Sequence, residues 1–162
     1  MKKLIIIGIV VVIIAIISFV LQFVYLQGID TKYAIEYSKR LGSHDISQID
    51  TFLNEYTTLT YKGETKMYKE LRPNIITAFN EKKFIMAKDS SYGHGTNYFI
   101  ARIQTIKIQS YINLDGKSVE NYIEMQLEKT GFKKFRVKSL SSDDEFFGYL
   151  FFGISTTRVN VP

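Results

Sequence analysis

The chain has 162 residues, with 21 lysines and arginines against 16 aspartates and glutamates, a formal charge of +5, and no cysteine. The lack of cysteine excludes a disulfide-stapled fold and a lipid-modified cysteine anchor. The mild positive balance does not indicate the clustered basic face of a nucleic-acid-binding protein, so we expect no nucleic-acid partner.

The first element is an uncharged run of 23 residues, Leu4–Leu26. As a helix it is about 35 Å long, enough to cross a hydrocarbon core of about 30 Å. Its apolar residues lie on every side, so it has no single face to bury against a soluble core. The run therefore predicts a retained transmembrane helix. The alternative, a cleaved signal peptide, has a shorter apolar region and a small-x-small cleavage site, and neither is present.

Two lysines, Lys2 and Lys3, directly precede this run, and the first cation after it is Lys32. Positive flanks stay in the cytoplasm, so we expect residues 1–3 to be cytoplasmic and residues 30–162 to form one extracytoplasmic domain. That part carries 19 cations and 16 acids, a balance that weakly favours anionic lipid headgroups. The composition is typical of a Gram-positive bacterium, and the predicted localisation is the cell membrane, with a single pass and the N-terminus inside.

Three helical segments are predicted next. The first is Asp30–Leu41, with Asp30 as N-cap and Gly42 as terminator, or alternatively a continuation of the membrane helix with a break at Gly28. The second is Asp45–Leu53, capped by Ser43 or Asp45. A third is expected to end near Lys83 and, because proline removes a backbone bond, to be kinked or split at Pro73.

Between the second and third helices, TTLTYKGET favours extended structure with a turn at Lys62-Gly63. The second half of the chain favours strands: a short one in FIMAKD, then a long one over residues 98–114. A change of side-chain parity within the long segment predicts a β-bulge. Asp115-Gly116 is the strongest hairpin signal in the chain.

Two further strands follow this turn, in VENYIEMQLE and FKKFRVKSL. Each alternates apolar and polar residues, so each has one buried face. The polar face is rich in Glu on the first and in Lys and Arg on the second, which favours antiparallel pairing of the two. The chain as a whole is therefore predicted to be α+β: a transmembrane helix followed by two to three helices packed on a bent antiparallel sheet.

This order of elements resembles the NTF2-like superfamily, also called SnoaL-like or cystatin-like. The resemblance rests on the entry helix YAIEYSKRL, on Asp45-Ile46-Ser47-Gln48-Ile49 at the start of the second helix, and on the closing hairpin IEMQLEKTGFKKFRVKSL. Phe135-Arg136-Val137 occupies a place where the family often has Trp-x-Val. The family resemblance covers about residues 30–141 and implies a cone-shaped domain. Membrane-anchored members with this layout include the VirB8-like and TcpC-like subunits of conjugation and secretion machines, and uncharacterised surface proteins of Firmicutes look similar.

Few residues suggest chemistry. His44 lies in a predicted helix–helix turn and is interpreted as part of a capping neighbourhood. His94 lies in DSSYGHGTNY, interpreted as a flexible connection between strands, with a cavity or loop site formed by Tyr61, Tyr92 and His94 as the alternative. No metal-ligand set or nucleophile–base pair is visible. We therefore predict no enzyme activity, no catalytic residues, no metal and no cofactor.

The segment EFFGYLFF is rich in aromatic residues. It is too short to span a bilayer, so we interpret it as a final buried strand or helix that closes the cone. The alternative is an exposed patch that docks a partner. The aromatic residues concerned are Phe146, Phe147, Tyr149, Phe151 and Phe152.

The functional hypothesis is a non-catalytic, membrane-anchored interaction or assembly domain, such as a subunit of a secretion or conjugation machine. Its expected partners are the bilayer, through Leu4–Leu26, and other membrane or surface proteins, with self-association left open. The alternative is a membrane-tethered ligand-binding or immunity module that uses the cone cavity, and a cavity enzyme comes third. An assembly domain predicts a filled interior, a binder predicts an open aromatic cavity, and an enzyme predicts a buried carboxylate or histidine in that cavity.

Overall fold

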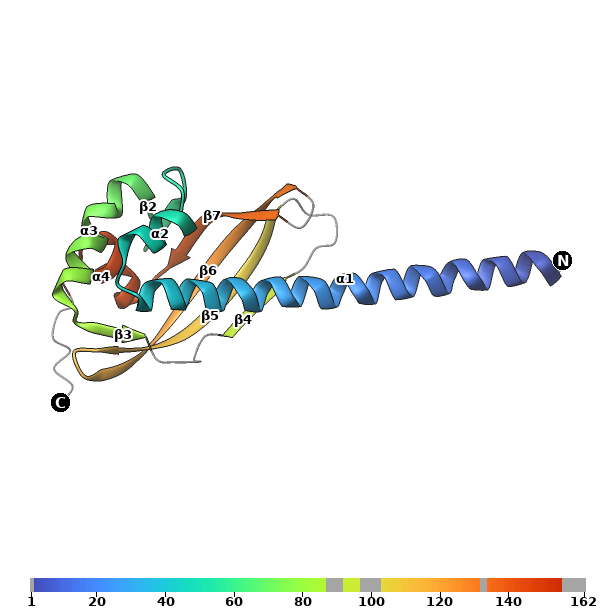
Figure 1. The fold of residues 1–162 in the computed structure, drawn as a ribbon, viewed down its shortest axis with the longest axis horizontal. Coiled ribbons are helices and arrows are strands. Elements are labelled where there is room, and N and C mark those ends of the chain that lie inside the picture. Colours follow the sequence, from blue (N-terminus) through green and yellow to red (C-terminus); the bar gives the residue numbers. More distant parts are fainter. Residues whose placement is uncertain (1, 87–91, 97–102, 132–133, 156–162) are drawn as a thin grey trace.

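The computed structural model describes residues 2–86, 92–96, 103–131 and 134–155 (Figure 1). Within these ranges, the side chains of residues 2–4, 22–23, 25–27 and 92–96 are outside the description. A long helix projects from one end of a compact α+β domain, and the N-terminus lies at the far tip of this helix.

The long helix, α1, runs without interruption over Lys2–Gly42. The predicted break at Gly28 is therefore absent, and the prediction of Asp30 as an N-cap is wrong. Asp30 lies inside the helix and is 2% exposed, and its carboxylate accepts a hydrogen bond from Gln104 Nε2. An N-cap residue lies at the start of a helix, whereas Asp30 follows 28 helical residues of α1. No helix in the described part of the chain is long and apolar enough to cross a membrane.

The C-terminal third of α1 belongs to the domain core. Its buried residues lie along one helical face, on which successive turns contribute Ile29 and Asp30, then Ala34, then Tyr37 and Ser38, then Leu41. Since Ile29 is already 7% exposed, the domain begins almost directly after the uncharged run, with no flexible linker between them.

The short helix α2, Ile46–Phe52, follows a turn, and its predicted cap is confirmed. The carboxylate of Asp45 accepts a hydrogen bond of 2.9 Å from the backbone N–H of Ser47. The predicted hairpin is also confirmed, as strands β1, Thr58–Tyr61, and β2, Glu64–Met67. Lys62 and Gly63 both have positive φ in the turn between them.

Helix α3 spans Tyr68–Glu81 as one element with Pro73 inside it. The expected split into two parts does not occur, and the helix ends two residues before Lys83, with Lys82 in the left-handed region. Pro73 is the sixth residue of α3, so its missing N–H removes a bond only near the start of the helix. The apolar face of α3 stays continuous through this point, with Leu71, Ile75 and Phe79 all buried.

The remaining strands complete a seven-stranded sheet, in the order β2-β1-β7-β6-β5-β3 with β4 also paired to β5. All pairs are antiparallel except β1 and β7, which run parallel. The strands not yet introduced are β3 Phe84–Met86, β4 Tyr92–Thr96, β5 Ile103–Leu114, β6 Lys117–Gly131 and β7 Lys134–Ser142.

The hairpin between β5 and β6 turns at Asp115-Gly116, as predicted, and both residues have positive φ. The predicted bulge is not found in the described part of β5, which pairs with β6 without a register shift. Irregularities lie instead between β6 and β7, at Gln126/Leu127 and Lys129/Gly131. These shifts bend the sheet at its centre. The first part of the predicted long strand, residues 98–102, lies outside the described residues.

The core lies between one face of the sheet and the helices (Figure 1). Inward positions alternate along β6, where Asn121, Ile123, Met125 and Leu127 are buried, as the sequence pattern predicts. Helix α4, Glu145–Phe152, closes the core after β7. The opposite face of the sheet is exposed and mostly polar.

Candidate functional site

The aromatic C-terminal segment belongs to the interior. Phe146, Phe147 and Phe151 are at most 1% exposed, Tyr149 is buried, and Phe152 is half-buried. The ring of Phe146 meets that of Phe84 on β3 edge-on, at 5.1 Å between centroids. The structure thus places these rings in the core and not in an exposed docking patch, because α4 turns them toward the sheet.

Helix α4 packs very closely on β1. A Cβ placed on Gly148 would lie 2.6 Å from Cζ of Tyr61, well inside van der Waals contact. Tyr61 is 6% exposed and packs on Phe152, with 5.5 Å between the ring centroids. This part of the cone interior is therefore filled by side chains.

The three residues proposed as a cavity or loop site do not come together along the sheet. Tyr61 is on β1, whereas Tyr92 and His94 are on β4, and β7, β6 and β5 lie between them. The side chains of Tyr92 and His94 lie outside the described residues. The interpretation of this segment as a flexible connection is wrong for residues 92–96, which pair with Thr105–Gln109 of β5.

The other histidine, His44, has a structural role. Its φ of 51° lies in the left-handed region, in the turn between α1 and α2. Nε2 of His44 lies 3.0 Å from the carbonyl oxygen of Phe84, and the ring contacts those of Phe79 and Phe84. The side chain therefore links the helical turn to β3.

A few polar groups are buried on the inner side of the sheet. Besides Asp30 and its partner Gln104, these include the Tyr37 hydroxyl and the Asn121 side chain. Tyr37 Oη and Asn121 Oδ1 have no hydrogen-bond partner among the described residues. Burial raises the pKa of Tyr37 far above its usual range, so the phenol stays neutral.

A buried carboxylate with a polar partner in a cavity is the arrangement that an enzyme site would show, and Asp30 is a buried carboxylate with such a partner. A catalytic carboxylate must be reachable by a substrate. Asp30 is 2% exposed and lines none of the three pockets described below. The Asp30–Gln104 contact joins α1 to β5.

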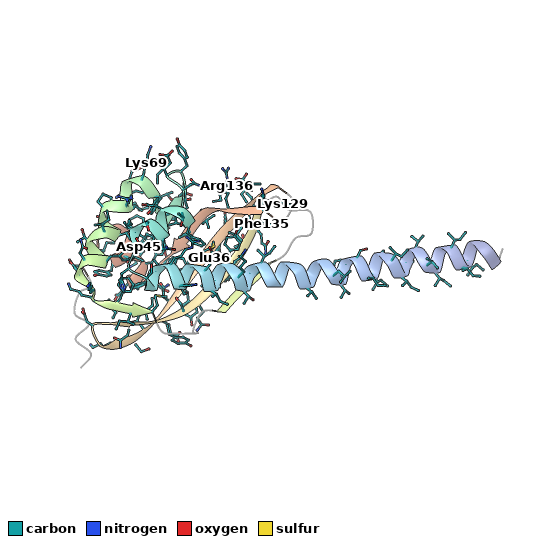
Figure 2. The ribbon with its side chains drawn as sticks, in the orientation of Figure 1. Glu36, Asp45, Lys69, Lys129, Phe135 and Arg136 are labelled. Atoms are coloured by element: carbon teal, nitrogen blue, oxygen red, sulfur yellow. The ribbon has the colours of Figure 1, made fainter. Side chains whose placement is uncertain are left out.

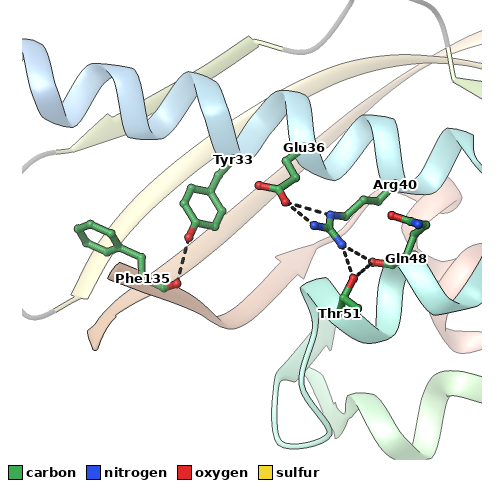
Figure 3. A network of polar contacts seen from close by, with 6 residues as sticks. All are labelled: Tyr33, Glu36, Arg40, Gln48, Thr51 and Phe135. Carbon is green, nitrogen blue, oxygen red and sulfur yellow. Dashed lines mark hydrogen bonds and ion pairs between the residues drawn. The ribbon is translucent and has the colours of Figure 1, made fainter. Parts of the chain in front are cut away.

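A polar pocket of about 220 Å³ lies between α1, α2 and β7 (Figure 3). Tyr33 donates a hydrogen bond of 3.0 Å to the carbonyl of Phe135 across it. Arg40 reaches from α1 to α2, where Nη1 donates to the Gln48 carbonyl at 2.7 Å and contacts Thr51 Oγ1. The same guanidinium is paired with Glu36 one turn earlier on α1.

The other charges that line this pocket are also paired. Asp50 accepts hydrogen bonds of 2.9 and 2.8 Å from Arg72 and one of 2.7 Å from Tyr68. The hydrogen bond from Arg72 is the main reason why the pKa of Asp50 lies below its usual value. Arg136 is paired with Glu128 at 2.6 Å. The charged side chains that line this pocket are therefore all paired within the chain, and these pairs connect α1 with α2, α2 with α3, and β6 with β7.

The Glu128–Arg136 pair also tests the predicted charge complementarity of β6 and β7. The two residues are directly opposite in the register, and Glu128 is 8% exposed. The prediction that opposite charges meet across these strands is confirmed for this pair.

A hollow of about 310 Å³ lies on the outer face of the sheet. Directly paired residues form its floor across four strands: Lys107 on β5 opposite Glu124 on β6, then Ser141 on β7 opposite Thr60 on β1. The hollow is also lined by Ile108, Tyr122, Ile123, Ser142 and Asp143.

Tyr122 lines this hollow, and Gln109 Nε2 donates a hydrogen bond to its hydroxyl and to that of Tyr111. Tyr122 donates a hydrogen bond of 2.5 Å to Glu120 and accepts one of 2.9 Å from Gln109. Tyr111 is 38% exposed and Tyr122 50% exposed. The pKa of Tyr122 is raised, chiefly by its hydrogen bond to Glu120. We call this surface the outer sheet face; it is formed by Lys107, Gln109, Tyr111, Glu120, Tyr122 and Glu124. It was not predicted, although the period-2 pattern of β5 and β6 already placed these residues on one side.

A third depression runs along the solvent side of α1 and reaches α2, lined by Ile35, Lys39 and Asp45 among others. Ile35 is 53% exposed there. Among the described residues, no group of three or more His, Asp or Glu side chains is placed to hold a metal ion.

The sequence matches no protein-family model, and no curated protein matches it either. Solved structures do match. A proposed ketosteroid isomerase from Shewanella frigidimarina NCIMB 400 is 9% identical, with 68% of this chain and 90% of that one covered and a TM-score of 0.53. A cystatin-like protein of unknown function from Nostoc punctiforme PCC 73102 is 14% identical, with coverages of 72% and 87% and a TM-score of 0.50.

An NTF2-like protein of unknown function from Shewanella oneidensis MR-1 also matches, at 10% identity, coverages of 66% and 89% and a TM-score of 0.49. The domain has the NTF2-like fold. This NTF2-like domain follows the predicted order of helices and bent sheet. At such low identity the likeness concerns the fold alone, and NTF2-like domains carry no single activity.

Proposed function

We propose that the chain is a single-pass membrane protein whose NTF2-like domain serves as a non-catalytic, extracytoplasmic interaction module. The observation that carries the proposal is the apolar surface of the N-terminal half of α1. Its described large side chains from Ile5 to Val24 are 48–66% exposed on all sides of the helix. So large an uncovered apolar surface is unstable in water and is favourable in lipid.

The described run of side chains, 5–21, is shorter than the uncharged run of the sequence, Leu4–Leu26. The anchor is proposed from the full run, which has the length that a bilayer requires. Lys2 and Lys3 at its start favour a cytoplasmic N-terminus. The unbroken α1 would then hold the domain directly above the opposite surface of the membrane.

The interior of the domain supports an interaction role over ligand binding or catalysis. Helix α4 fills the core beside β1, and the charged groups of the α1–α2–β7 pocket are paired within the chain. The outer sheet face, by contrast, is exposed and presents Tyr111 and Tyr122 beside charged residues. Tyrosines are enriched at protein interfaces because they offer a large contact area and a polar group. We therefore propose this face as the contact surface for another membrane or surface protein, as in a subunit of a secretion or conjugation machine.

The proposal is tested by membrane extraction and site-specific photocrosslinking in a Gram-positive host. We expect alkaline washing to leave the full chain in the membrane and detergent to release it. A photoreactive residue at Tyr122 is expected to give crosslinked products, and the same residue at Lys69, on α3, serves as the matched control. Release of the wild-type chain by alkali would refute the anchor. Identical crosslinking at both positions would refute the assignment of the outer sheet face.

A further inference from the structure

We propose that the end of the β6–β7 hairpin docks onto anionic lipid headgroups of the leaflet that the domain faces. This inference rests on the proposed membrane anchor. It assigns a lipid-binding surface to described residues at the end of the domain nearest the apolar half of α1: Lys32, Lys129 and Lys134. We call this surface the basic end.

The fold places the basic end near the start of the domain. Tyr33 is hydrogen-bonded to the backbone of Phe135, and Tyr33 follows the end of the uncharged run by seven residues, or about 10 Å along the helix axis. From Phe135 the hairpin extends through Lys134, which pairs with Gly131. Each strand residue adds about 3.3 Å.

Figure 1 shows that this hairpin end points toward the N-terminal half of α1, and Figure 2 shows Lys129 on the same side of the domain. The basic end therefore lies roughly 7–10 Å from the level at which the uncharged run stops. The Debye length is about 8 Å at physiological ionic strength, so charges at this height still interact with a charged membrane surface.

The charge of the basic end is not cancelled within the described residues. Lys32, Lys129 and Lys134 are all exposed. Three acids lie near it along these elements: Asp30 is buried and contacts Gln104, Glu36 is paired with Arg40, and Glu128 is paired with Arg136. The sequence from Lys129 to Lys138 contains five cations and no acid.

The continuity of α1 restricts how the domain can be oriented relative to the membrane. Because the helix enters the core at Ile29 without a break, the domain cannot swing freely on a linker. Its orientation is set by the tilt of α1 and by contacts at the membrane surface. Attraction of the basic end to anionic headgroups would favour the tilt that brings the hairpin onto the lipid and leaves the outer sheet face in a fixed orientation.

The chain has no cysteine, so a single label can be introduced at Thr130, which is exposed. The full-length Thr130→Cys chain, carrying a fluorophore, is placed in nanodiscs whose neutral lipids include a fraction with a spin-labelled headgroup, with or without phosphatidylglycerol. Quenching reports the proximity of the hairpin to headgroups. A label at Lys69→Cys is the distance control, because Figure 2 places Lys69 on α3, away from the hairpin end.

We expect strong quenching at position 130 with phosphatidylglycerol, weaker quenching without it, and none at position 69. Neutralising Lys129 and Lys134 to Gln should lower the ratio of docked to undocked domains roughly 25-fold, since each cation near an anionic surface contributes about fivefold. The matched control is Lys69→Gln with Lys117→Gln, which changes the net charge equally at exposed sites away from the hairpin and should leave the quenching unchanged.

Equal quenching at position 130 in neutral and anionic nanodiscs would overturn the proposal, and so would equal effects of the two double substitutions. Failure of the anchor gives a different result, because the wild-type chain would then not be retained in nanodiscs at all. A retained chain that shows no quenching at position 130 refutes the docking and leaves the anchor intact.

Discussion

Replacing Gly148 by alanine tests whether the interior of the cone is filled. The added Cβ would lie 2.6 Å from Cζ and 2.9 Å from Cε2 and Oη of Tyr61. Carbon atoms in folded proteins pack at about 3.5–4.0 Å, so the ring or helix α4 must move by most of an ångström. Tyr61 is buried and already contacts Phe152, which restricts the movement of its ring.

Two opposing effects determine the change in unfolding free energy that Gly148→Ala causes. Alanine is favoured over glycine inside a helix by about 1 kcal/mol. Overpacking a well-packed core costs about 1–3 kcal/mol, and a contact this short belongs at the upper end of that range. We therefore expect Gly148→Ala to lower the free energy of unfolding by about 2 kcal/mol.

Chemical denaturation of the full chain in detergent, followed by near-UV circular dichroism of the tyrosines, measures this change. Gly28→Ala is the matched control, since Gly28 is also in a helix and has no atom within 4 Å of an added Cβ. It should cause no loss of stability. In a Tyr61→Leu background, which removes the ring, Gly148→Ala should cost far less. An equal cost in both backgrounds, or no cost at all, would show that the space beside Gly148 is not filled as described.

Three further predictions concern other parts of the domain. The pKa of Asp50 is lowered in the folded state, mainly by the hydrogen bond from Arg72. The stabilisation of the fold by ionised Asp50 is therefore fully present above its unfolded pKa and is lost as the pH falls through its folded pKa. Asp50→Asn should reduce the loss of unfolding free energy at acid pH by less than about 1 kcal/mol, because the Asp50–Arg72 pair is partly exposed. Gly116→Ala should lower the free energy of unfolding by about 1 kcal/mol, since φ is +83° at this position, and an unchanged urea midpoint would contradict this. Tyr111→Ala with Tyr122→Ala should leave the melting temperature nearly unchanged but abolish crosslinking from the outer sheet face, whereas retained crosslinks would exclude that face as the contact surface.

Local signals in the sequence were sufficient for several elements. The cap at Asp45, the turn at Asp115-Gly116 and the alternation along β6 each depend on residues that are neighbours in the chain. The aromatic segment 146–152 was also predicted to close the core, because a run so apolar and so short has few other stable positions in a folded domain.

Features that depend on distant parts of the chain were not predictable in the same way. Asp is a residue type that favours the N-cap position, but Asp30 lies within α1 because the helix already extends from Lys2. Strand β4 contains two glycines and has a poor strand propensity, and it is held by its pairing with β5. The parallel pairing of β1 with β7 joins segments about 80 residues apart, and nearly 90 residues separate Gly148 from Tyr61. No local pattern encodes such contacts.

The proposed topology, in which α1 crosses the membrane and the domain lies outside, is tested directly by cysteine accessibility in intact protoplasts. The chain has no native cysteine, so Lys3→Cys and Lys69→Cys each give one labelling site. A membrane-impermeant maleimide should label position 69 in intact protoplasts and position 3 only after lysis. Protection of position 69 until lysis would contradict the proposed topology.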